Sequence, residues 1–358
     1  MTTMNTDMPV VDLRSDTLTV PTEAMRAVMR MAEVGDDGRV DAAGRGGDPT
    51  VNRLEDCAAD LLGKEAALFC PSGTMANLVA LATWCERGDA AALEPDLHVL
   101  RTEKSPFMDK FLGIRPVYYE RDAQGMPEVT AFAAACAAPG VKLACVENSH
   151  NFGGGICVAL ARQQALAAAA RKAAVPVHMD GARLFNAAVA LGVDAASLAT
   201  CADSVMFCLS KGLGAPFGSV LCGSHDFIAR ARQTRKLLGG GMRQAGIMAA
   251  AGLVALETGI DRLVEDHENA HRLGAALAAY GEFALTPVQS NIVMLDISAS
   301  GRTSEWFEQK LAPLGLLAKG MGKDHLRFTT YRGVERQHID RAIGAFAQFM
   351  EENRALWA

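Results

Sequence analysis

Short apolar runs recur along the first two thirds of the chain, and stretches of helix length rich in alanine and leucine alternate with them. The runs are too short for helices and are apolar almost throughout, which is typical of buried strands. They span residues 66–70, 141–147, 175–179 and 204–209. The longer stretches predict helices at residues 50–62, 75–86 and 161–174. Strands that alternate with helices predict an α/β fold with a mostly parallel sheet.

The last third of the chain repeats this alternation on a smaller scale. A long apolar helix at 245–257 leads to strand-like runs at 290–297 and 325–331, and a terminal helix is expected at 335–353. A chain of 358 residues is longer than one ordinary core requires, so two domains are expected. We predict an N-terminal segment at 1–20, a large domain at 21–258 and a small C-terminal α/β domain at 259–358.

Residues 34–50 interrupt this pattern. They contain five glycines and show no hydrophobic period, so they predict a loop. A solvated, mobile loop is the simpler interpretation. The alternative is that Arg39 and Arg45 line an enlarged substrate entrance.

Composition narrows the class of protein. Half of the residues are hydrophobic and only 21% are charged, which suffices for a large core. A net charge of −6 provides no basic surface for nucleic acid. The nine cysteines form no C-x-x-C pair, as expected of reduced, buried thiols, and no apolar run reaches the length of a membrane span. These features predict a cytoplasmic protein without a nucleic-acid or membrane partner.

Two of the predicted strands end in groups that can do chemistry. The run at 175–179 leads into Asp180, and the run at 204–209 leads into Ser210 and Lys211. Ligands of open α/β sheets bind at this edge, so both side chains are expected to face one cleft. Glycines after Lys211 let the backbone approach a bound group, which suits a lysine that forms a Schiff base. Alone, Lys211 would be interpreted as a solvated loop lysine.

An aspartate one strand away from such a lysine could hold the ring nitrogen of pyridoxal phosphate (PLP) protonated. A phosphate site is predicted where the strand at 66–70 ends. Gly73 and Thr74 follow it at the start of a helix, where backbone N–H groups and the helix dipole attract phosphate. Many helices begin in this way, but Ser210 beside Lys211 adds a second phosphate donor. We predict PLP as the cofactor and no metal.

Seven segments of the sequence resemble the L-threonine aldolases, which are PLP enzymes of fold type I within the β-eliminating lyase superfamily. The segments are D-L-R-S-D-T (12–17), D-P-T-V-N-R-L-E (48–55), P-S-G-T-M-A-N (71–77), E-N-S-H-N (147–151), D-G-A-R-L-F-N-A (180–187), L-S-K-G-L-G-A-P (209–216) and L-G-G-G-M-R-Q (238–244). The resemblance implies an aspartate-aminotransferase-like fold. Its large domain has a mostly parallel seven-stranded sheet between helices, and a small C-terminal domain follows.

The resemblance also implies roles for single residues. Lys211 would form the Schiff base with PLP, and His98 would lie over the ring and serve as the candidate base, directly or through a water. Arg183 would contact the phenolic oxygen of the ring and the substrate. Ser15 and Arg327 would bind the substrate α-carboxylate.

Further positions concern assembly and departures from the family pattern. Lys236 and Arg243 would reach the active site of a neighbouring subunit, with Arg243 contributing to cofactor binding, which implies a homo-oligomer and favours a homotetramer. The stretch 34–50 lacks the tyrosine usual in the family, residues 104–111 differ from it, and Tyr331 stands where a histidine is common.

Three hypotheses follow. The first is a retro-aldol lyase that cleaves a β-hydroxy-α-amino acid, similar to L-threonine, L-allo-threonine or a bulkier analogue, into glycine and an aldehyde. The second is a related PLP lyase, transaldolase or racemase, for which the cations Arg39, Arg45, Lys104 and Lys110 would suit an acidic or bulky side chain. The third is a catalytically silent homologue that serves as a binding protein, against which the joint presence of the four residues Lys211, Asp180, Arg183 and Arg327 argues.

Overall fold

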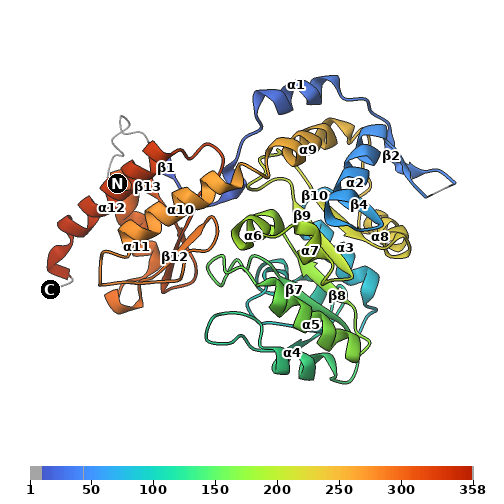
Figure 1. Cartoon of the computed structure of the whole chain (residues 1–358), viewed down its shortest axis with the longest axis horizontal. Helices are drawn as coiled ribbons and strands as arrows, with labels where there is room; N and C mark the ends of the chain where they lie inside the picture. Colours follow the sequence, from blue (N-terminus) through green and yellow to red (C-terminus); the bar gives the residue numbers. More distant parts are fainter. Residues whose placement is uncertain (1–9, 43, 357–358) are drawn as a thin grey trace. The chain divides into compact units, whose positions relative to one another are not determined.

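The computed structural model describes residues 10–42 and 44–356, so residues 1–9 of the predicted N-terminal segment lie outside the description. The described chain forms two compact units (Figure 1). The larger unit comprises residues 20–153 and 157–261. The smaller unit comprises residues 154–156 and the described parts of 1–19 and 262–358. The predicted domain limits at residues 20 and 258 stay predictions.

A seven-stranded sheet forms the centre of the larger unit, with strand order β4-β10-β9-β8-β7-β5-β6. Only β10 runs antiparallel to its neighbours. In sheet order the bounds are Ala66–Cys70, Ser219–Gly223, Ser204–Cys208, Val177–Asp180, Val141–Glu147, Ala90–Leu93 and Arg115–Tyr118. The predicted α/β fold with a mostly parallel seven-stranded sheet is confirmed.

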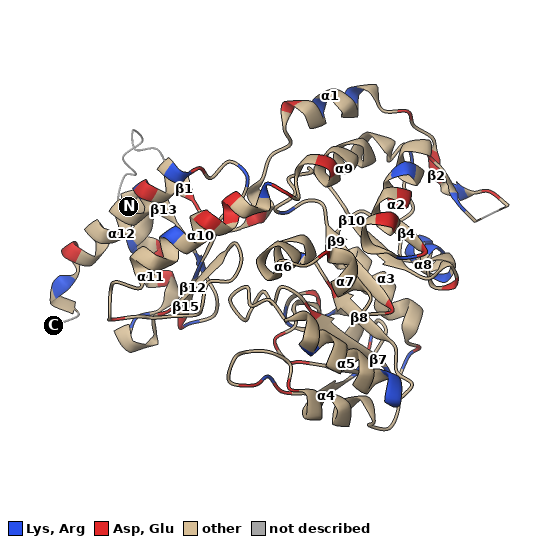
Figure 2. Ribbon diagram, viewed as in Figure 1, with Lys and Arg blue, Asp and Glu red and all other residues tan. Residues whose placement is uncertain are grey.

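Helices cover both faces of this sheet because its strands are apolar on both sides. Met206 and Cys208 of β9 pack in a cluster with residues of α3 and α8. Between them, Phe207 points to the other face and meets Phe185 of α6 edge to face, with ring centroids 5.1 Å apart. Figure 2 shows α3 and α6 without charged residues, as expected of helices packed on a sheet.

The helices of the larger unit are α1 (Glu23–Met31), α2 (Pro49–Leu62), α3 (Gly73–Trp84), α4 (Val129–Cys136), α5 (Leu160–Lys172), α6 (Leu184–Leu191), α7 (Ala195–Ala199), α8 (His225–Leu237) and α9 (Gly246–Thr258). The helices predicted from the sequence are present with ends shifted by one or two residues. Within the described residues, no helix is both long and apolar enough to cross a bilayer.

The smaller unit is a four-stranded antiparallel sheet under helices. Its strand order is β11-β12-β15-β14, with bounds Ala284–Leu285, Ile292–Asp296, His325–Thr329 and Lys319–Gly320. Strand β1 (Val11–Asp12) pairs in parallel with β13 (Leu316–Leu317). The helices are α10 (Leu263–Leu277), α11 (Ser304–Leu311) and α12 (Arg336–Glu352). Its core is mostly aliphatic, with five phenylalanines packed within it, Phe283, Phe307, Phe328, Phe346 and Phe349.

The stretch predicted as a loop at 34–50 is a hairpin, so that prediction is wrong for its strands β2 (Asp36–Val40) and β3 (Gly46–Gly47). Buried charge, which hydrophobic periodicity does not detect, anchors it. Asp37 is 1% exposed, and its Oδ2 lies 2.6 Å from a guanidinium nitrogen of Arg235 on α8. The neighbouring Arg232 pairs with Glu55 of α2 at 2.6 Å.

A second carboxylate anchors the base of the hairpin, where β3 leads into α2. Asp48 accepts hydrogen bonds from the backbone N–H groups of Thr50 and Val51 at the start of α2. Its second oxygen accepts from Gly35 and from Gly246 at the start of α9. One side chain therefore joins three segments that lie far apart in the sequence.

We expect Asp37→Asn to lower the free energy of unfolding by about 3 kcal/mol, because it keeps the shape of the side chain but leaves the buried Arg235 without its counter-ion. Asp56→Asn is the matched control, since Asp56 pairs with Arg45 on the surface and its loss should cost less than about 1 kcal/mol. Urea unfolding measures both. Equal losses would show that the buried pair does not anchor the hairpin.

Candidate active site

Asp180 and Lys211 lie at the same end of the large sheet, where the neighbouring parallel strands β8 and β9 end. Asp180 is 5% exposed. Its Oδ1 accepts a hydrogen bond of 3.0 Å from the backbone N–H of Ala182, and its Oδ2 accepts one of 2.9 Å from Asn77. Lys211 is half-buried, and its positive charge acts on Asp180. The structure thus brings these two predicted residues together.

His98 lies near Asp180 and comes from the segment that follows strand β5. It directly precedes a π-helical turn, Val99–Glu103, and its backbone N–H donates to Glu147 at the end of β7, at 2.7 Å. Its ring Nδ1 lies 3.0 Å from Oε1 of Glu103. Polar atoms of His98, Glu103 and Asp180 all lie within 4.8 Å of one another. Hydrogen bonds join this cluster, through the His98–Glu103 contact and through Asn77.

The charges in this cluster support one another. Burial alone would raise the pKa of Asp180, but His98 and Lys211 hold that pKa below its ordinary value. Burial alone would lower the pKa of His98, but the hydrogen bond to Glu103 and the charge of Asp180 raise it. Burial raises the pKa of Glu103 itself. The site therefore favours an ionised Asp180 beside a His98 that readily holds a proton.

Asn77 is a site residue that sequence reasoning missed. Its side-chain amide donates to Asp180 Oδ2 at 2.9 Å and to Glu103 Oε1 at 3.0 Å, so one group bridges both acids. Asn77 is the last residue of the motif P-S-G-T-M-A-N, and it stands four residues after Gly73 in α3. Helical spacing from the predicted phosphate site could have indicated that it faces the sheet.

Gly73 and Thr74 are the first residues of the twelve-residue helix α3, as predicted to within two residues. The helix is capped by Ser72, whose Oγ accepts from the N–H of Met75 at 3.1 Å. Within the described part of the chain, the backbone N–H groups of Gly73 and Thr74 donate to no other protein group. Ser210 is half-buried and precedes Lys211 directly. These donors match the anion site that the sequence predicts.

Arg183 is buried close to the same strand ends. It is 6% exposed, and its guanidinium donates to Oδ1 of Asn151 at 3.2 Å. The backbone N–H of Asn151 donates to Glu147 at 2.7 Å. His150 of the same motif contacts Glu94 through Nε2 at 3.0 Å and accepts from Gly153 through Nδ1, so both ring nitrogens have partners within the protein.

Ser15 and Arg327 belong to the smaller unit. Arg327 lies on β15, is 7% exposed and donates to the backbone carbonyl of Arg14 at 3.1 Å, which places it beside the residue before Ser15. Ser15 Oγ accepts from the N–H of Thr17 at 3.2 Å. Tyr331 donates to the backbone carbonyl of Asp12 at 2.8 Å, and burial raises its pKa to about 12. Tyr331 therefore holds the N-terminal strand in place.

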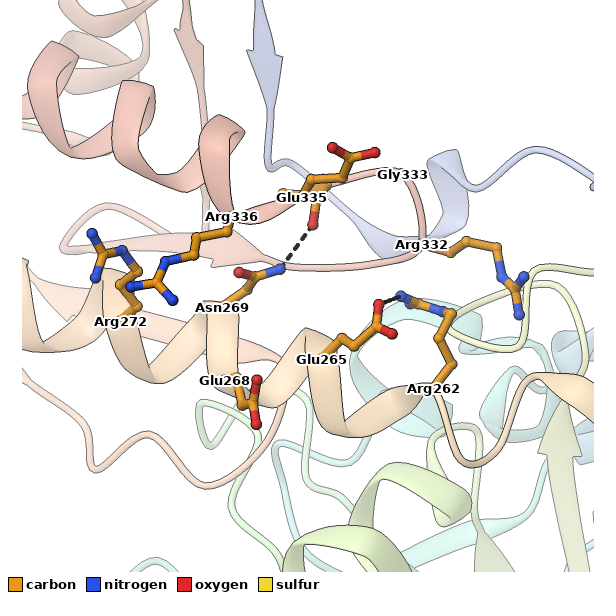
Figure 3. A pocket seen from close by; sticks show the side chains of 10 residues that line it. Arg262, Glu265, Glu268, Asn269, Arg272, Arg332, Gly333, Glu335 and Arg336 are labelled. Carbon is orange, nitrogen blue, oxygen red and sulfur yellow. Dashed lines mark hydrogen bonds and ion pairs between the residues drawn. The ribbon is translucent and has the colours of Figure 1, made fainter.

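A polar cavity of about 490 Å³ also lies in the smaller unit, between α10 and the segment 332–336 (Figure 3). Arginines and glutamates line it, and Arg262 pairs with Glu265 at 3.3 Å on one side. Asn269 crosses it to donate to the carbonyl of Val334 at 2.9 Å. None of the site residues predicted from the sequence lines this cavity.

Residues 12–300 match the family described as Beta-eliminating lyase. The chain belongs to this family. This lyase is 43% identical over 354 residues to the low specificity L-threonine aldolase of Escherichia coli (strain K12), covering 95% of the chain and 99% of the relative. It is 38% identical to low-specificity L-threonine aldolase 1 of Arabidopsis thaliana, with 96% and 97% covered. The resemblance drawn from the seven motifs is thereby confirmed.

A solved structure agrees in fold. The threonine aldolase of Leishmania major superposes on this lyase with a TM-score of 0.76 at 18% sequence identity, covering 97% of the chain and 99% of that structure. At this identity the comparison supports the fold of the lyase. The residue-level roles in the site stay predictions.

We expect Glu103→Gln to lower the pKa of His98, because a neutral amide supports the imidazolium less well than a carboxylate does. The raised pKa means that protonated His98 stabilises the fold at low pH, and that this contribution is lost as the pH rises through the raised value. NMR titration of the His98 ring measures the change. Asp96→Asn is the control, since Asp96 pairs with Arg121 instead, and an equal fall there would contradict the assignment.

Proposed function

We propose that this lyase is a PLP-dependent aldolase that cleaves a β-hydroxy-α-amino acid, such as L-threonine, L-allo-threonine or a bulkier analogue, into glycine and an aldehyde. The observation that carries the proposal is the buried, ionised Asp180 with Lys211 at the same end of the sheet. Relatives named low-specificity L-threonine aldolases, aligned over nearly the whole chain, support the choice of reaction.

The residues present fit PLP. Asp180 is ionised although buried, so it can accept a hydrogen bond from a protonated ring nitrogen. We assign Lys211 to the cofactor aldehyde and Gly73, Thr74 and Ser210 to its phosphate. His98 would lie over the ring, and Arg183 would bind its phenolic oxygen. When bound, PLP withdraws electrons from the substrate α-carbon and so makes bond cleavage there possible.

The protein's own groups would then bind and orient the substrate. Arg327 offers a planar guanidinium to the α-carboxylate, and Ser15 adds a hydroxyl donor. Holding the carboxylate fixes which bond to the α-carbon is set for cleavage.

The proton on the β-hydroxyl needs an acceptor. Because Nδ1 of His98 faces Glu103, the other ring nitrogen, Nε2, is the atom available for that proton. The Glu103 carboxylate would stabilise the imidazolium that results. We therefore assign His98, directly or through a water, as the base, and Glu103 as the residue that would orient it.

A related PLP lyase or transaldolase, which eliminates a β-substituent or transfers the carbanion, is the second candidate. The family description, Beta-eliminating lyase, supports it. So does the divergent stretch 104–111, where Lys104 begins a turn with φ of 58° and Lys110 lies over the ring of Phe111.

The purified protein with added PLP should show a visible absorbance band from the lysine-bound cofactor and should release aldehyde from L-threonine, L-allo-threonine or L-phenylserine. Lys211→Ala should lose the band and lower turnover by at least about a thousandfold, because no amine replaces the nucleophile. Lys172→Ala on α5 is the control. Keto acid and ammonia without aldehyde would favour the second candidate, and absence of the band would favour the silent homologue.

We also propose a homo-oligomer, favouring a homotetramer, in which Lys236 and Arg243 complete the active site of a neighbouring subunit. Arg243 is three-quarters exposed and pairs only loosely with Asp36, at 3.3 Å. Leu237, beside Lys236, is 87% exposed, a large apolar surface for a side chain that faces water. We place the protein in the cytoplasm, which suits its nine free thiols, eight of them buried.

Mixing two inactive variants tests the shared site. We expect Lys211→Ala and Arg243→Ala each to lack activity, and an equal mixture, after subunit exchange, to recover up to about a quarter of the wild-type activity, because half of the dimers carry one intact site. Light scattering on the same samples gives the oligomeric mass. Two variants that exchange subunits without recovery would show that each site is built from one chain.

A further inference from the structure

A chain of hydrogen bonds runs through the core of the larger unit to Asp180. Trp84 Nε1 donates to Ser204 Oγ at 2.8 Å, and Ser204 Oγ lies 2.9 Å from Nδ1 of His178. His178 Nε2 lies 3.1 Å from Oδ1 of Asn77, whose amide nitrogen bonds to Asp180. Ser204, His178 and Asn77 are at most 1% exposed. The assignments above give no role to His178, although it stands two residues before Asp180 on β8.

The direction of this chain follows from its carboxylate end. The Asn77 amide faces two acids, Asp180 and Glu103, and an ionised carboxylate only accepts hydrogen bonds. The NH₂ group of Asn77 must therefore point at the acids. Its carbonyl Oδ1 is left to face His178, and it can only accept.

His178 must then donate from Nε2. Burial lowers its pKa to about 4, so at neutral pH the ring carries one proton, and Nδ1 is an acceptor. The hydroxyl of Ser204 donates to Nδ1, and its oxygen accepts from Trp84, which can only donate. With the ring proton of His178 on Nε2, every hydrogen bond of the chain donates in one direction, from the indole N–H of Trp84 toward the carboxylates.

We infer that His178 is a positioning residue that, through this one-way chain, locks the Asn77 amide across Asp180 and Glu103 and so holds the Asp180 carboxylate in place for the ring of the cofactor. The inference rests on the proposed role of Asp180. Without a donor at His178, the buried Oδ1 of Asn77 loses its partner, so the amide is held at the acids alone and can shift away from Asp180. The fixed amide leaves Asp180 no freedom to rotate away from its second donor, Ala182.

The first test needs no cofactor. In the apoprotein, ¹⁵N NMR of the His178 ring should show a proton on Nε2 and none on Nδ1 at pH 7. The opposite tautomer, or a ring that exchanges between both, would overturn the inference. This result does not depend on whether the protein is an aldolase.

The second test follows PLP affinity and the pH dependence of the visible band along the chain. His178→Leu removes the donor and should weaken PLP binding about tenfold and shift the pH at which the band changes. His178→Gln offers an N–H to Asn77 and a carbonyl to Ser204, so it should restore both properties. Trp84→Phe keeps the stacking on Phe227 and leaves Ser204 free to donate, so it should change affinity less than about twofold.

These variants distinguish failure of the inference on His178 from failure of the proposed function. Equal weakening in His178→Leu and His178→Gln would indicate that only the packing of the ring matters and would overturn the inference. If His178→Leu does not fold, the comparison of His178→Gln with Trp84→Phe still tests the inference. A larger loss of PLP affinity in His178→Gln than in Trp84→Phe would contradict it. Wild-type protein that shows the expected tautomer but binds no PLP would instead refute the proposed function.

Discussion

The larger unit depends on keeping a carboxylate ionised where water hardly reaches it. Asp180 sits at the end of an apolar strand, and burial alone would favour its neutral form. Two N–H donors, the neighbouring His98 and the positive charge of Lys211 reverse that preference. The elements that supply them come from α3, from the turn after β8, from the segment after β5 and from the end of β9. The sheet order is what brings these four places to one edge.

The hydrophobic pattern predicted four strands of the large sheet, β4, β7, β8 and β9, and the residues at their ends. The strands β5, β6 and β10 were not predicted from it. Runs such as 141–147 and 204–209 are apolar on both faces, a pattern that only a strand between two helical layers satisfies. The same runs end at Asp180 and Lys211, so the pair at the sheet edge was predictable. The seven motifs added the family, which the comparisons confirm.

The features that could not be predicted are hydrogen bonds and ion pairs between polar side chains inside the core. Asn77 and His178 are buried, and their identity alone does not reveal which partner lies across the fold. The hairpin at 36–47 escaped prediction for the same reason, since Asp37 meets Arg235 across some two hundred positions of sequence. Such pairs form through tertiary packing, so the local hydrophobic periodicity of the sequence does not predict them. Tyr331 stands where the family resemblance expects a histidine. Only the structure shows its contact, a hydrogen bond to the backbone carbonyl of Asp12.

The two ends of that hairpin are held by different carboxylates, Asp37 on one strand and Asp48 after the other. Neither anchor involves the tip between them. On the tip side, Arg45 adds a surface pair with Asp56 of α2 at 2.9 Å, so the hairpin touches α2 at both its base and its return strand. The buried anchors at the base therefore hold the hairpin firmly, while its outer part is held only by exposed contacts that salt can screen.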